Sequence, residues 1–180
     1  AVNGMSYSMR AGKNANSAIL VQIPRRDFDQ GHPLDGFQFQ KKLEQLGYYE
    51  GFAAPAQNIK DYLKHTPSDK LVIPTSYPRS TIMKDMHAFF SDEVNIAMEE
   101  GMKQFDKRIH GWIDQGIMIG LETRSSSPIK ILRNDDGSSS TIQGLYPCGE
   151  GAGYAGGIVS SAVDGIKQAE NYIAHLNQYP

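Results

Sequence analysis

The chain has 180 residues, of which 39% are hydrophobic and 21% are charged, and its formal net charge at pH 7 is −2. This near-neutral charge argues against a surface for nucleic acid or anionic membrane, and no apolar run approaches the roughly 18 residues that cross a bilayer. The composition is typical of a globular protein, and the length allows one domain or two.

Cys148 is the only cysteine in the sequence. It excludes an intrachain disulfide and a cysteine-rich metal cluster, which favours a reducing compartment, so we expect a cytoplasmic protein. The five histidines show neither metal-ligand spacing nor a nucleophile partner, so no metal site is predicted. They are His32, His65, His87, His110 and His175.

Helices dominate the pattern of the first part of the chain. A buried strand is predicted over 18–23, a helix over 34–46 that ends at Gly47, and a short helix over 56–63. A short strand is possible over 71–73.

Two further helices are predicted after this strand. Ser80 or Thr81 caps the first, which runs to residue 90, and Ser91 caps a longer one. The longer helix carries an apolar stripe that is typical of a core-facing surface. Its members are Val94, Met98, Met102, Phe105, Ile109 and Trp112.

After Gly116 the pattern changes from helical to extended. Strands are predicted over 117–122 and 129–132, followed by a tight turn over 134–137. The change places a domain boundary near residue 115, between a mostly helical part (1–115) and a β-rich part (116–180).

Residues 144–165 predict a strand over 144–148, then a glycine loop and a helix. Because five glycines lie between Gly149 and Gly157, backbone N–H groups and the positive end of the helix face whatever binds there. Glu150 stands at the end of the strand, where a carboxylate can accept hydrogen bonds from sugar or ribityl hydroxyls.

Residues 151–156 match G-x-G-x-x-G, but no second strand with an acidic residue follows the helix. The pattern therefore predicts a last strand and a last helix rather than a first βαβ unit. The helix is expected to be apolar almost to its end, at Ile158, Ala162, Val163, Ile166, Ala169, Ile173 and Leu176.

Residues 140–150 (Ser-Thr-Ile-Gln-Gly-Leu-Tyr-Pro-Cys-Gly-Glu) resemble the second FAD motif of flavoproteins of the glutathione-reductase type. In that motif a Thr or Ser, a Gly-aliphatic-Tyr strand and a Gly-Asp pair follow one another, and Glu150 replaces the usual Asp. With residues 3–6, 15–18, 54–57 and 120–128, the chain resembles the bacterial FAD-dependent dehydrogenases, also called NAD(FAD)-utilizing dehydrogenases.

The resemblance implies that Glu150 binds the ribityl chain and that Gly156, Gly157 and Ile158 approach the flavin ring. The other cofactor-binding candidates are Gly149, Gly151, Tyr154 and Arg124. The Arg124 guanidinium can bind a flavin carbonyl edge, a phosphate or a carboxylate, or it can pair with Glu122 at the surface.

The fold class implied is α/β, or α+β for the chain as a fragment: a substrate or cap domain (1–115), then the closing strands and last helix of an FAD-binding domain (116–180). Members of the family are much longer, with a pyrophosphate site in an N-terminal half that is absent here. We therefore expect a C-terminal fragment of an FAD-dependent oxidoreductase, inactive alone, with NAD(P)H as a candidate electron donor. Its substrate is a small molecule, and its catalytic residues are unassigned.

Another class of function remains open. A stand-alone, non-catalytic domain would use the glycine loop to bind a phosphate or a peptide, and it would have a closed core. In that case Glu150 is a helix N-cap and Gly156 and Gly157 serve close packing of the helix. Cys148 is expected to be buried and inert in either case.

Overall fold

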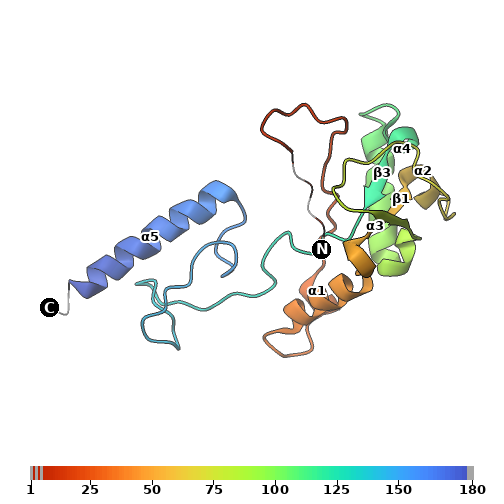
Figure 1. The fold of residues 1–180 in the computed structure, drawn as a ribbon. Coiled ribbons are helices and arrows are strands. Elements are labelled where there is room, and N and C mark those ends of the chain that lie inside the picture. The colour runs from red at the N-terminus through yellow and green to blue at the C-terminus, as the bar shows by residue number, and fades with distance from the viewer. Residues whose placement is uncertain (1, 3, 5, 178–180) are drawn as a thin grey trace. The chain divides into compact units, whose positions relative to one another are not determined.

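The structure is a computed structural model that describes residues 2, 4 and 6–177 (Figure 1). Its internal contacts divide the chain into two compact units. Unit 1 comprises Ala1–Asp27 and Gln40–Thr123, and unit 2 comprises Phe28–Phe39 and Arg124–Pro180. Within the described residues, no helix has both the length and the apolar character that a membrane span requires.

Unit 1 is built on a three-stranded mixed sheet in the order β2-β1-β3. The central strand β1 (Ala54–Asn58) is buried along its whole length. It pairs in parallel with β2 (Thr81–Met83) and antiparallel with β3 (Ile117–Ile119). The predicted α/β class is confirmed in this form, as a small mixed α/β domain.

The central strand replaces part of a predicted helix. The helix prediction over 56–63 is wrong for residues 56–58, and α2 is limited to Ile59–Tyr62. The buried Gln57 amide explains the difference, because it donates to the Thr66 carbonyl at 2.9 Å and accepts from the Met86 N–H at 2.8 Å. These two bonds fix both flanking loops on the strand.

The loop after α2 is held by polar side chains rather than by a strand over 71–73, which does not form. Asn58 accepts from the Val72 N–H at 2.9 Å and donates to the Lys70 carbonyl at 2.9 Å. Ser68 donates to Asp61 at 2.6 Å, and this bond lowers the pKa of the Asp61 carboxyl. The loop therefore has a fixed path despite its irregular backbone.

Several helix predictions are confirmed. α1 spans Asp35–Leu46, and α3 spans Asp92–Asp106 with Ser91 as its N-cap, whose hydroxyl accepts from the Val94 N–H. The helix predicted up to residue 90 is wrong, because β2 and the 3-10 helix η3 (Met86–Phe89) occupy that segment. The strand predicted over 18–23 does not form.

Three shorter elements complete the secondary structure described for unit 1. They are the 3-10 helices η1 (Arg25–Asp27) and η2 (Glu50–Phe52) and the helix α4 (Trp112–Gln115). α3 ends before the predicted stripe does, and Trp112 begins α4 instead, with its ring edge-on to Phe105 at 5.6 Å between centroids. The buried core consists of Ile59, Tyr62, Met86, Met98, Met102 and Leu121.

Unit 2 consists of the start of α1, a long irregular segment and α5 (Ile158–Leu176), the predicted last helix. The predicted turn over 134–137 forms, with the Gly137 N–H bonded to the Asn134 carbonyl at 2.9 Å. The strands predicted over 129–132 and 144–148 do not form in the described part of this unit, which has only an isolated bridge between Arg133 and Ser139. The sheet thus lies in unit 1, contrary to the expected order of a helical part and a β-rich tail.

Candidate functional site

The glycine loop of residues 149–157 is folded back on itself before α5 begins. The Gly153 N–H donates to the Glu150 carbonyl at 2.9 Å, and the Tyr154 N–H donates to the Gly149 carbonyl at 3.0 Å. The Gly149 N–H donates to a carboxylate oxygen of Asp164, in α5, at 2.8 Å. The loop and the helix are therefore joined by a charge-assisted bond.

Arg133 and Asp164 form a bidentate ion pair beside this loop. The two guanidinium–carboxylate contacts measure 2.8 and 3.0 Å, and Arg133 also donates to the Pro147 carbonyl at 2.9 Å. The hydrogen bonds from Arg133 and from Gly149 N–H lower the pKa of Asp164 to about 2. The pair thus fixes residues 147–149, which lead into the loop: Arg133 holds the Pro147 carbonyl, and Asp164 holds the Gly149 N–H.

We expect unit 2 to lose stability in acid through this carboxylate. Because its pKa falls from 3.8 to about 2 on folding, its contribution is complete above about pH 4 and disappears as the pH falls toward 2. Urea unfolding of the wild type between pH 5 and 2 should show a steeper loss of stability than that of Asp164→Asn. Equal slopes for the two proteins would contradict the assignment.

The Tyr154 side chain connects the glycine loop to the segment of residues 129–133. Its hydroxyl donates to the Ile131 carbonyl at 3.0 Å, the Arg133 guanidinium carbon lies 3.6 Å from the ring centroid, and the Lys130 Nζ lies 4.5 Å from it. The ring therefore packs against residues 129–133 of its own unit. Arg133 and Asp164 were missed in the sequence, because 31 positions separate them and no local motif contains both.

Glu150 is half-buried, and among the described residues no hydrogen bond or ion pair engages its carboxylate. It is not the N-cap of α5, since Gly157 holds that position. A negatively charged acceptor is thus available in the loop itself.

The loop glycines fall into two kinds. Gly153 has a φ of +83°, and a Cβ there would lie 2.6 Å from the Ile129 carbonyl oxygen, so the fold itself requires glycine. A Cβ at Gly151 or Gly156 would meet nothing within 4 Å. Close packing within this chain therefore explains Gly153 and does not explain Gly151 or Gly156.

Among the described residues, the first turn of α5 also has no group that compensates its positive helix dipole. It has no acidic residue and no side-chain cap, and the Ile158 side chain is 93% exposed. The Ser161 hydroxyl is buried without a partner among the described residues. The helix end keeps its positive dipole and free N–H groups for another group.

Of the other residues singled out in the sequence, Cys148 directly precedes the loop, and Arg124 lies three residues before Ser127 in the sequence. Ser127 donates to the Gly151 carbonyl at 3.1 Å, which brings the segment that begins with the exposed Arg124 to the loop. Cys148 is exposed, so the expectation of a buried thiol is wrong. The reason is that residues 144–148 form no strand in a sheet that would cover it.

Residues 1–125 match the family described as "FAD-dependent protein, C-terminal domain-like". The chain belongs to this family. It is also 44% identical over 177 residues to an "Uncharacterized protein" of Clostridium beijerinckii (strain ATCC 51743 / NCIMB 8052). This alignment covers 95% of the chain and 33% of the relative, so the chain spans a third of the relative's length.

The family match confirms the predicted kinship with FAD-dependent proteins. The matched residues end at 125, before the glycine loop. The cofactor-binding residues named from the sequence therefore remain predictions, now with a described geometry.

Proposed function

We propose that the chain is the C-terminal part of a longer FAD-dependent oxidoreductase, whose residues 149–158 hold the ribityl and isoalloxazine side of FAD. The observation that carries this proposal is the free Glu150 carboxylate next to open glycines and an uncapped helix start. The carboxylate can accept hydrogen bonds, the open glycines admit a ligand close to the backbone, and the helix start offers N–H donors, so together they match the polar chain and the ring edge of a flavin.

Each group has a separate task in this proposal. Glu150 accepts hydrogen bonds from ribityl hydroxyls, and Gly151 and Gly156 let the backbone approach the cofactor closely. The first N–H groups of α5 stabilise negative charge at the carbonyl edge of the ring. FAD, when bound, supplies hydride transfer, with NAD(P)H as the candidate donor.

The remaining part of the longer protein is proposed to supply the pyrophosphate site and to cover α5. Apolar residues of this helix are exposed within unit 2, among them Ile166 at 61% and Ile173 at 56%. An apolar face of this length on a 19-residue helix is unusual for a closed domain. It therefore argues against the stand-alone phosphate- or peptide-binding alternative, which needs a closed core.

Unit 1 is proposed to provide the substrate side. It has an open pocket lined by four aromatic residues, Tyr48, Tyr49, Phe52 and Tyr77. The Lys84 Nζ lies 4.9 Å from the centroid of the Tyr49 ring. Aromatic faces with a nearby cation suit a small, partly planar molecule.

Glu150→Ala in the longer protein should weaken FAD binding by about 10- to 100-fold, because a hydrogen bond to a charged group contributes about 1.5–3 kcal/mol. FAD affinity of the apoprotein, measured by calorimetry, tests this result. Glu150→Asp should bind like the wild type, since it restores the acid that is usual in the motif. Glu100→Ala, an exposed position on α3, is the matched control. Unchanged FAD affinity in Glu150→Ala would refute the ribityl assignment.

A further inference from the structure

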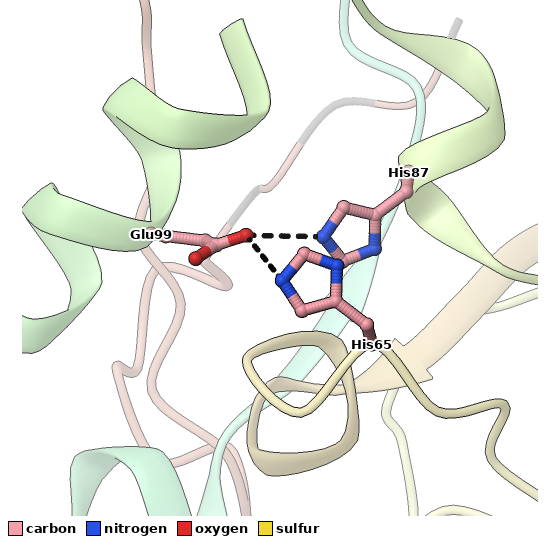
Figure 2. Close-up of side chains that lie close together, drawn as sticks. All are labelled: His65, His87 and Glu99. Atoms are coloured by element: carbon pink, nitrogen blue, oxygen red, sulfur yellow. Dashed lines mark hydrogen bonds and ion pairs between the residues drawn. The ribbon is translucent and has the colours of Figure 1, made fainter. Parts of the chain in front are cut away.

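Two histidines and a glutamate from three separate segments meet in unit 1 (Figure 2). His65 follows α2, His87 lies in η3, and Glu99 lies in α3. Figure 2 shows both imidazole rings directed toward the same carboxylate. The positions of the histidines in the sequence predicted no metal site, so only the fold reveals this cluster.

The distances in the cluster are those of a metal-binding set. The Glu99 Oε1 lies 3.1 Å from the His65 Nε2 and 3.2 Å from the His87 Nε2. In a tetrahedral site with metal–ligand bonds of about 2.0–2.1 Å, neighbouring ligand atoms are about 3.3 Å apart. One ligand atom from each of the three residues lies within 4.8 Å of the other two, a separation that a single bound ion can span.

His87 is held in the orientation that a metal ligand needs. Its ring stacks on Tyr62 with 3.9 Å between centroids, and its carbonyl accepts from the Asn95 amide at 3.1 Å. The Asp85 Oδ1 lies 3.2 Å from the His87 Nδ1. A hydrogen bond from Nδ1–H to this carboxylate leaves the lone pair of Nε2 free, as in carboxylate–histidine–metal arrangements.

Two of the three side chains in the cluster are largely shielded from solvent, and the third is exposed. The His87 and Glu99 side chains are 15% and 14% exposed, whereas the His65 side chain is 65% exposed. Lys103 approaches the other carboxylate oxygen, Oε2, at 3.5 Å, which leaves Oε1 for an ion. Three protein ligands with an open side leave room for a water or another donor in a fourth position.

We propose that His65, His87 and Glu99 bind one divalent first-row transition-metal ion. Two imidazoles and one carboxylate are a ligand set of zinc(II) and of non-haem iron(II). Magnesium and calcium are disfavoured, because these ions prefer oxygen ligands throughout. The site lies entirely within unit 1 and is independent of the glycine loop.

Calorimetric titration of the untagged, metal-free chain with Zn²⁺ tests the proposal. One ion should bind per chain with micromolar or tighter affinity, and Mg²⁺ should not bind. Co²⁺ should give the visible absorption bands of a site with nitrogen and oxygen ligands, and Zn²⁺ should abolish them. Absence of saturable Zn²⁺ binding would overturn the proposal.

His65→Asn is the most informative variant. His65 is exposed and has a φ of +53°, a conformation that asparagine tolerates, so the fold should survive the change. It should weaken Zn²⁺ binding by about 100-fold, as should Glu99→Gln, whereas Asp85→Asn should weaken it by about 10- to 100-fold. His110→Asn, at an exposed histidine outside the cluster, should bind like the wild type. Equal Zn²⁺ affinity in His65→Asn and His110→Asn would show that the cluster is only a hydrogen-bonded one.

Discussion

Gly156→Val in the longer protein is expected to abolish FAD retention without lowering the stability of the fold. A Cβ at this position meets nothing within 4 Å in the chain, so a larger side chain has room when no cofactor is bound. With FAD present, a β-branched side chain would stand where the backbone approaches the ring. We expect a loss of affinity of about 100-fold, as overpacking of a close contact produces.

Two other glycines separate this effect from a general loss of structure. Gly153→Val should unfold the loop itself, because φ is +83° and the Ile129 carbonyl oxygen blocks a Cβ. Gly101→Val, on α3 with open space around it, should change neither property. Flavin absorbance after gel filtration measures FAD retention, and urea unfolding measures the stability of the fold. Full flavin occupancy in Gly156→Val would mean that the loop faces elsewhere.

Local signals were sufficient to predict several helices and one turn. The apolar period and the Ser91 cap predicted α3, the apolar period predicted α5, and the Asn-Asp-Asp-Gly run predicted the turn over 134–137. In each case the deciding contacts are made within a few residues. Propensity and pattern therefore carry enough information.

The sheet was harder to predict. β1 contains Pro55 and two polar amides, which argue against a central strand in a sequence. Gln57 and Asn58 are buried because distant loops satisfy them, and such partners leave no local trace. The opposite error is a strand predicted where none forms, and it occurs at residues 129–132 and 144–148. An extended segment becomes a strand only when a partner strand is present.

The same contrast applies to the candidate sites. The glycine loop is a continuous motif, so its residues could be named from the sequence. The Arg133–Asp164 pair and the cluster of His65, His87 and Glu99 join separate segments of the chain. Their members are ordinary polar residues until the fold brings them together.

The second large effect concerns the 180-residue chain alone, which should retain no FAD and show no dehydrogenase activity. The proposed site has one carboxylate, open glycines and the start of α5, all at one side of a cofactor. Phosphate binding at a helix N-terminus after a G-x-G-x-x-G loop contributes much of the affinity of such domains. We propose that this phosphate site belongs to the part of the longer protein outside this chain. In the isolated chain the exposed apolar face of α5 would also lack its proposed cover.

Calorimetric titration of FAD into the isolated chain, beside the apoprotein of the longer protein, measures this division directly. The longer protein should bind close to one FAD per chain, and the isolated chain should give no saturable heat up to about 100 times the dissociation constant of the longer protein. Turnover with FAD, NADH and an artificial electron acceptor should likewise be absent in the isolated chain. Micromolar FAD binding by the isolated chain would contradict the division of the cofactor site, as would a longer protein that binds no FAD.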